Sequence, residues 1–329
     1  PEVLRQVLSA EQLMFDWRAG VGVDWDRYRF MLTTATVQQP LALVAHERLA
    51  DFFTERGAAL YGLEEARVEA SKHLEQVIDL TPKRYGYLMQ RARYYLVLEL
   101  DYRSARDVLQ RGRMRNPDAA LNVFGLTQIA VREGRIGDAR ELLAGAENYF
   151  APRRTAWLAA FARLAVVTGD YERALELANL AAAEATEFRT RIEAMITAAE
   201  AAHLSGDPEG ARALLARLPA DLWPEMRSLS LPVRIALDEA GVVPGDLGGS
   251  ADAGRPDPYL RARVAAAAGQ TDVALEAIET GLQLRDERLL DSLRVARYWG
   301  SVRSEPQFAV LLKTLTAMET RSVTPGTGS

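Results

Sequence analysis

The three histidines are the side chains of this chain best suited to metal binding or acid–base chemistry. His46, His73 and His203 are spread along the sequence, and none has a second histidine at the spacing of a zinc-binding helix. Cysteine is absent, which excludes disulfides, thiolate metal sites and a cysteine nucleophile. The spacing therefore favours surface or groove histidines over metal ligands.

Other catalytic signatures are missing as well. The sequence has no Gly-x-Ser-x-Gly elbow, and Gly20-Val21-Gly22 lacks the third glycine of a dinucleotide-binding fingerprint. The acidic pair Glu64-Glu65 falls at the start of a predicted helix, where carboxylates interact favourably with the helix dipole and face solvent. We therefore expect a protein that is not an enzyme and that holds no cofactor and no metal.

The amino-acid composition limits the kinds of partner that the protein is expected to bind. With Lys+Arg at 40 and Asp+Glu at 45, the formal net charge of −5 disfavours direct nucleic-acid binding and attraction to anionic membranes. No apolar run reaches the roughly 18 residues that a spanning helix needs, so membrane insertion is not expected. No signal peptide is visible after Pro1. These features predict a cytoplasmic location, and an extracytoplasmic sensor region stays open as an alternative.

Turn residues recur along the chain with a nearly constant period. Gly134 and Gly169 are 35 residues apart, Gly169 and Gly206 are 37 apart, and Leu100 lies 34 residues before Gly134. Each of these residues begins a three-residue turn, and an alanine follows three residues past the end of the turn, at Ala105, Ala139, Ala174 and Ala211. A glycine can end a helix in the left-handed conformation, and Asp170 can cap the next helix. The pattern predicts helical hairpins in which alanine lies where two helices cross closely.

These residues resemble the tetratricopeptide repeat family, whose period is about 34 residues with two helices per unit. The resemblance covers roughly Leu41 to Leu218 and returns from Pro256 to Leu284, where Gly269-Gln270-Thr271 precedes Ala274. It implies an all-α fold, a right-handed superhelical solenoid of antiparallel helix hairpins. The chain departs from the family at the consensus tryptophan, which is replaced by Met89, Val123, Leu158 and Met195.

Five segments are predicted along the chain. Residues 1–40 form a helical pair, Glu2–Phe15 and Trp25–Thr36, joined at Gly20-Val21-Gly22. Residues 41–241 form the repeat array, whose first hairpin runs from Leu41 to Arg56, stops at Gly57, and returns from Leu63 to Leu80. Residues 242–255 read as a Gly/Pro-rich linker, residues 256–321 as a C-terminal hairpin with capping helices, and residues 322–329 as a disordered tail.

The end of the chain carries a second resemblance. Its residues are Trp299, Arg303, Pro306, Phe308, Leu311 and Leu312. They look like the closing segment of tetratricopeptide sensor regions in bacterial signalling proteins, among them winged-helix regulators, adenylate cyclases and serine/threonine kinases. This implies a protein–protein interaction scaffold or sensor region of a bacterial signalling or regulatory protein. A self-standing adaptor or assembly protein is the alternative, and an enzyme with an unrecognised site is the third reading.

The resemblance also implies where a partner binds. In the family, the first helix of each hairpin lines a concave groove, and the corresponding positions here are Tyr87, Gln90, Tyr94, Phe124, Gln128, Arg163, Glu200, His203, Tyr259 and Arg263. Aromatic and arginine side chains commonly anchor a bound protein or peptide. The rival interpretation is that the aromatic residues pack against the next repeat. The family's lysine–asparagine clamp for a terminal carboxylate is missing, and the sequence leaves the oligomeric state open.

Overall fold

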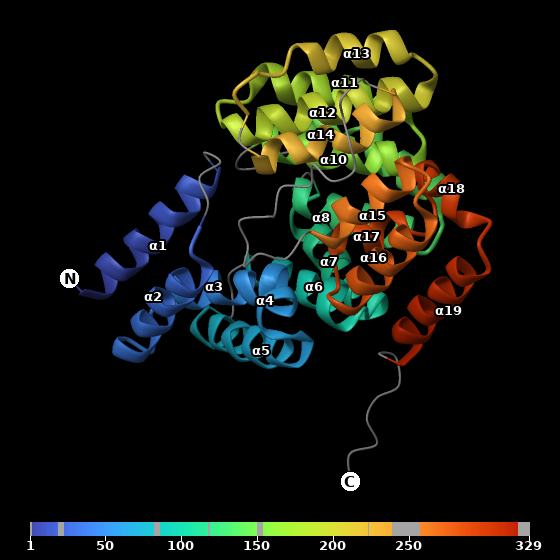
Figure 1. Cartoon of the computed structure of the whole chain (residues 1–329). Coiled ribbons are helices and arrows are strands. Elements are labelled where there is room, and N and C mark those ends of the chain that lie inside the picture. Colours follow the sequence, from blue (N-terminus) through green and yellow to red (C-terminus); the bar gives the residue numbers. More distant parts are fainter. Residues whose placement is uncertain are drawn as a thin grey trace. The chain divides into compact units, whose positions relative to one another are not determined.

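Helices make up the fold of this protein (Figure 1). The computed structural model describes residues 2–18, 23–81, 86–117, 119–149, 154–222, 224–238 and 257–321. Within these ranges every regular element is a helix and no strand occurs, so the predicted all-α class is confirmed. The predicted joint at Gly20-Val21-Gly22, the linker 242–255 and the tail 322–329 lie outside the described residues.

The chain divides into two compact units. Unit 1 comprises Pro1–Pro117, Gln283–Arg285 and Leu315–Ser329. Unit 2 comprises Asp118–Leu282 and Asp286–Thr314. Each unit therefore draws on residues that are far apart in the sequence.

Unit 1 is a series of helices in which neighbours along the chain pack on one another. Its helices are α1 (Glu2–Arg18), α2 (Trp25–Gln38), α3 (Leu43–Phe52), α4 (Ala58–Tyr61), α5 (Leu63–Leu80), α6 (Gly86–Tyr94) and α7 (Tyr102–Arg115). Two π-helical turns extend α3 and α6, namely η1 (Phe53–Gly57) and η2 (Tyr95–Glu99). Helices α1 and α2 lie within residues 1–40, for which a helical pair was predicted.

The first helix of the first hairpin ends later than predicted. The helical path continues past Gly57 to Tyr61, and Gly62 makes the turn with φ +95°, a conformation that favours glycine. Gly57 serves another purpose, since a Cβ at this position would lie 2.9 Å from the Cβ of Ala66 on α5. The predicted stop at Gly57 was therefore wrong, because this glycine permits a close helix crossing.

Unit 2 contains the regular hairpins. Its elements are α8 (Ala120–Arg132), α9 (Ile136–Leu143), η3 (Ala146–Asn148), α10 (Arg154–Thr168), α11 (Tyr171–Glu184), α12 (Phe188–Ser205), α13 (Pro208–Ala216), α14 (Pro224–Ala236), α15 (Pro258–Ala267), α16 (Thr271–Gln283), α17 (Glu287–Ser292), η5 (Arg297–Trp299) and α18 (Gly300–Arg303). The last helix, α19 (Pro306–Arg321), begins in unit 2 and ends in unit 1. Helix α10 packs on α11, α11 on α12, and α12 on α13.

The predicted turns are present. Gly169 has φ +74° and ends α10, and its neighbour Asp170 accepts a hydrogen bond from the backbone N–H of Arg173 at the start of α11. Leu100 takes the same left-handed conformation, with φ +54°, where the other repeats have glycine. Each turn reverses the chain over a few residues, which is why consecutive helices can pack side by side.

The alanines after the turns are confirmed as core residues. The members of this set, all with 0% exposure, are Ala105, Ala139, Ala174, Ala211 and Ala274. In unit 2, Ala174 belongs to an apolar cluster with Leu158, Phe161 and Leu177, and Ala211 belongs to another with Leu215 and Val233. A larger side chain at such a position would have no space.

The stacking of the hairpins into a right-handed superhelix stays a prediction. Among the described residues, no helix is both long and apolar enough to cross a membrane.

Candidate functional site

The predicted groove residues fall into two groups, one in each unit. Helix α6 of unit 1 carries Tyr87, Gln90 and Tyr94. In unit 2, helix α8 carries Phe124 and Gln128, α10 carries Arg163, α12 carries Glu200 and His203, and α15 carries Tyr259 and Arg263. The group in unit 2 is larger. Its contacts within that unit determine which of these side chains are accessible to a partner.

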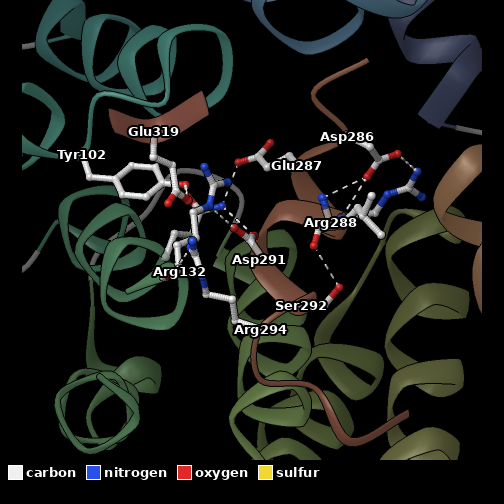
Figure 2. A network of polar contacts seen from close by, with 11 residues as sticks. Tyr102, Arg132, Asp286, Glu287, Arg288, Asp291, Ser292, Arg294 and Glu319 are labelled. Carbon is white, nitrogen blue, oxygen red and sulfur yellow. Dashed lines mark hydrogen bonds and ion pairs between the residues drawn. The ribbon is translucent and has the colours of Figure 1, made fainter. Parts of the chain in front are cut away.

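Helix α17 lies against α8 through a network of polar contacts (Figure 2). Gln128 donates from Nε2 to Glu287 Oε1 at 2.8 Å and to Asp291 Oδ2 at 2.9 Å. Arg132 donates from Nε to Asp291 Oδ1 at 2.6 Å, and Arg294 donates to the carbonyl oxygen of Arg132 at 2.7 Å. Residues four apart share one face of a helix, so Gln128 and Arg132 on α8 meet Glu287 and Asp291 on α17.

The Arg132–Asp291 pair of this network is buried. The side chain of Arg132 is 0% exposed and that of Asp291 is 9% exposed. Burial raises the pKa of Asp291, while the guanidinium of Arg132 acts in the opposite direction. Separating a buried ion pair leaves an uncompensated charge, so this pair favours one arrangement of the two helices.

A second pair joins α12 and α15. Glu200 receives two hydrogen bonds from the guanidinium of Arg263, and the two side chains are each 11% exposed. The same guanidinium lies 4.2 Å from the ring centroid of Tyr298, whose hydroxyl is 3.1 Å from that of Tyr259. Burial lowers the pKa of Arg263 and the Glu200 carboxylate raises it, with a net rise above the ordinary value.

A group of one arginine and two aspartates lies at the starts of two helices. Arg288 donates from Nη2 to Asp257 Oδ2 at 2.6 Å and to Asp286 Oδ2 at 2.9 Å. Both aspartates are also N-caps, because Asp257 accepts from the N–H of Leu260 and Asp286 accepts from the N–H of Arg288. Arg288 thereby links the starts of α15 and α17.

Several of the groove residues predicted in unit 2 are thus already in contact with other side chains of that unit. Gln128, Glu200, Tyr259 and Arg263 contact other residues of the same unit. Sequence reasoning missed the residues that fill it, Asp291, Arg132 and Tyr298, and the charged pattern Glu287/Asp291, four residues apart, was the available signal.

Arg163 differs from these residues. Residues 158–168 of α10 are buried apart from Arg163, whose side chain is 46% exposed. Its Nη1 lies 3.7 Å from Oε2 of Glu193 on α12, and the Glu193 side chain is itself 30% exposed. An ion pair at this distance and exposure is weak. Arg163 therefore presents a cation at the surface of an otherwise buried segment of α10.

The aromatic residues are mostly involved in packing. The ring of Phe124 is half-buried and lies edge-on to Trp157 at 5.3 Å and to Phe161 at 5.4 Å between centroids. This is the predicted alternative in which a groove aromatic packs against the next repeat. His203 is half-buried on α12.

In unit 1 the predicted residues of α6 are also half-buried. Gln90 donates from Nε2 to the carbonyl oxygen of Glu47 at 3.1 Å, and Tyr94 donates from its hydroxyl to Glu99 Oε1 at 2.7 Å. Burial and the contact with Glu99 raise the pKa of Tyr94. Two of the three side chains therefore have hydrogen-bond partners within unit 1.

Two histidines lie in the core, where a surface or groove position was predicted. His46 and His73 are 6% and 4% exposed, and their Nδ1 atoms are 2.9 Å apart. The prediction was wrong because the two residues are 27 positions apart and meet only when α3 packs on α5. Among the described residues, no group of three or more histidines and carboxylates is placed to hold a metal ion.

Compared with models of known protein families and with curated proteins, the chain matches none.

Proposed function

We propose that this chain is a non-catalytic protein-interaction module of the tetratricopeptide type, with its hairpins stacked as a right-handed superhelical solenoid. The repeated left-handed turns, the aspartate cap after Gly169 and the fully buried alanines support this architecture. A stack of such hairpins offers an extended face made of the first helix of each repeat.

The observation that carries the binding role is the exposure of Arg163. Arg163 lies on the otherwise buried segment 158–168 of α10, and its described ion pair, with Glu193, is long at 3.7 Å, so a carboxylate of a partner can form a shorter and stronger pair with it. Arginine is enriched among the side chains that dominate interface energetics. The proposed partner is a protein or peptide segment whose acidic side chain replaces Glu193 as the counter-ion.

The proposed setting is a sensor or scaffold region of a bacterial signalling or regulatory protein. Its support is the C-terminal closing segment, in which Trp299 is 0%, Phe308 2% and Leu311 5% exposed. A terminal segment that covers the last apolar face of a repeat array is expected to be buried in this way. The self-standing adaptor remains the second candidate, because the same cap would serve a complete repeat protein.

The test first selects peptides that bind the protein and then measures their affinity for a variant that lacks the Arg163 guanidinium. A phage-displayed library of random peptides is panned on the immobilised chain, and the selected peptides are titrated against wild type, Arg163→Ala and the matched control Arg261→Ala. Arg261 is also an arginine of unit 2, half-exposed and paired with the exposed Glu276. We expect acidic peptides that lose about 2 kcal/mol, near thirtyfold in Kd, with Arg163→Ala and little with the control. Equal binding by both variants would place the partner face elsewhere.

A further inference from the structure

Helices α3 and α5 of unit 1 are joined by a hydrogen bond between two buried imidazole rings. Nδ1 of His46 lies 2.9 Å from Nδ1 of His73, and the ring centroids are 5.1 Å apart. Nε2 of His46 lies 3.0 Å from the carbonyl oxygen of Pro40. Nε2 of His73 lies 3.6 Å from Oε2 of Glu69, and its ring is stacked on Phe53.

The partners of the four ring nitrogens fix the positions of the protons. A carbonyl oxygen only accepts, so His46 must donate from Nε2 to Pro40, and in the neutral ring its Nδ1 is then an acceptor. His73 must therefore donate from Nδ1 to His46 Nδ1, which leaves its Nε2 without a proton. The closed pair holds two protons, one on each ring, and both rings are neutral.

We propose that the His46–His73 pair is an acid-sensitive latch between α3 and α5, closed while both rings are neutral and weakened when the pair takes up further protons. A third proton can enter only at His73 Nε2, next to Glu69, and it creates a buried imidazolium. A fourth proton on His46 Nδ1 would place two N–H groups against each other and break the bond between the rings.

The surroundings of His73 favour the neutral ring. Burial, His46 and Lys72 lower the pKa of His73 to about 4, against the opposing effect of Glu69. The unfolded chain has a histidine pKa of about 6.5, so the unfolded state binds more protons between these values. The contribution of His73 to stability is therefore complete above about pH 6.5 and is lost as the pH falls towards 4.

The charged side chains of the neighbouring helices form ion pairs with residues other than His73. Glu69 and Lys72 of α5 are paired with each other near His73. Charged side chains from the elements packed on α3 and α5 form their own pairs: Arg29 of α2 with Glu65, Glu55 of η1 with Arg93 of α6, and Glu99 of η2 with Arg67. The groups that shift the pKa of His73 are thus His46, Lys72 and Glu69.

One group in the same unit titrates with the opposite effect. Burial and Glu55 raise the pKa of Asp51 on α3 to about 7. A raised carboxyl pKa favours folding at low pH and opposes it as the pH rises. The Asp51 and His73 contributions therefore partly cancel between pH 4 and 7, so the latch is measured in an Asp51→Asn background.

The first experiment uses the wild-type chain. Long-range ¹H–¹⁵N correlation spectra distinguish protonated from unprotonated ring nitrogens of all three histidines. At pH 7.5 we expect His46 protonated at Nε2 and His73 at Nδ1, with His73 titrating well below 6.5. A His73 ring that is charged at pH 7.5, or that titrates at 6.5 or higher, would overturn the latch.

The second experiment compares His73→Asn with His203→Asn, both in the Asp51→Asn background. Asparagine keeps a donor near the position of Nδ1 and removes the titration. The fall in Tm between pH 7.5 and 4.5 should be reduced by at least half in His73→Asn and unchanged in His203→Asn, since His203 lies in unit 2. Equal falls in the two variants would contradict the proposal, and a His73→Asn chain that does not fold leaves the spectra of the wild type to decide.

A zinc titration completes the test. The Nδ1 atoms face each other, so a metal ion bound between them would be the competing use of the same two residues. We expect the Tm at pH 7.5 to be the same with zinc chloride and with EDTA. A zinc-dependent rise that is lost in His73→Asn would replace the latch with a metal site.

Discussion

Arg132 on α8 and Asp291 on α17 form a buried ion pair with 2.6 Å between Nε and Oδ1, although 159 residues separate them in the sequence. Replacing Asp291 with alanine would leave the guanidinium of Arg132 buried without its carboxylate. We expect Asp291→Ala to lower the free energy of unfolding by about 3–5 kcal/mol, measured by urea denaturation.

The matched control for this prediction is an exposed pair in the same unit. Arg261 and Glu276 are 33% and 63% exposed in their side chains, with 3.2 Å between the charged atoms. Glu276→Ala should cost less than about 1 kcal/mol, because solvent screens an exposed pair. Similar losses for Asp291→Ala and Glu276→Ala would show that burial does not govern the contribution of the first pair.

Ala174 tests the close packing at the turns. Its side chain is 0% exposed in the cluster shared by α10, α11 and α12, so an indole has no space there. We expect Ala174→Trp to lower stability by about 1–3 kcal/mol or more, measured as a shift in the thermal unfolding curve. Ala183 is exposed on the same helix, and Ala183→Trp should leave the curve nearly unchanged. Equal shifts in the two variants would mean that the register of α11 is wrong.

Gly57 tests the crossing of η1 with α5. A methyl group at Gly57 would lie 2.9 Å from the Cβ of Ala66 and 3.1 Å from the ring of Phe53, so backbone or core must move. We expect Gly57→Ala to destabilise unit 1 by about 1–3 kcal/mol.

Gly137 provides the control for Gly57. It lies within α9, and a Cβ there would meet no atom of the described residues within 4 Å. Gly137→Ala should stabilise the chain by about 0.4–1 kcal/mol, because alanine restricts the unfolded chain and fits the helix. Chemical denaturation of both variants measures the difference, and a stabilising Gly57→Ala would refute the close crossing.

Asp51 provides a prediction with a defined pH window. Burial and Glu55 raise the pKa of Asp51 from its ordinary value of 3.8 to about 7, so its contribution to stability is complete below about pH 4 and is lost as the pH rises through 7. Asp51→Asn should be more stable than wild type at pH 7.5, by roughly 2–4 kcal/mol, and similar to it near pH 4. Denaturant titrations at the two pH values measure this, and a variant that is less stable at pH 7.5 would contradict the raised pKa.

The hairpin pattern could be predicted because its signals act over a few residues. Gly169 ends one helix, Asp170 caps the next by accepting from the N–H of Arg173, and Ala174 is buried one turn later. Each of these interactions depends on neighbours within about four positions, so residue type and spacing are sufficient to predict it. The same applies to α1 and α2 in the first forty residues.

Which of the predicted groove residues are covered by other helices of the protein could not be predicted in this way. Gln128 and Arg132 are polar residue types that are common on exposed binding faces. Helix α17 nevertheless covers them through Glu287 and Asp291. Arg163 occupies a corresponding position on α10 and stays exposed. Nothing within a few residues of either position distinguishes the two cases, since the difference comes from a segment more than a hundred residues later.

The sequence by itself therefore determined the helical class, the turns, the caps and the buried alanines of this protein. Only the tertiary structure decided that Gly57 is a crossing point, that His46 meets His73, and that Arg132 pairs with Asp291. The physical reason is the range of the forces that specify each feature. Helix ends are set by backbone hydrogen bonds and conformational preferences along a few residues, whereas the partner of a buried polar group is set by which helices pack together.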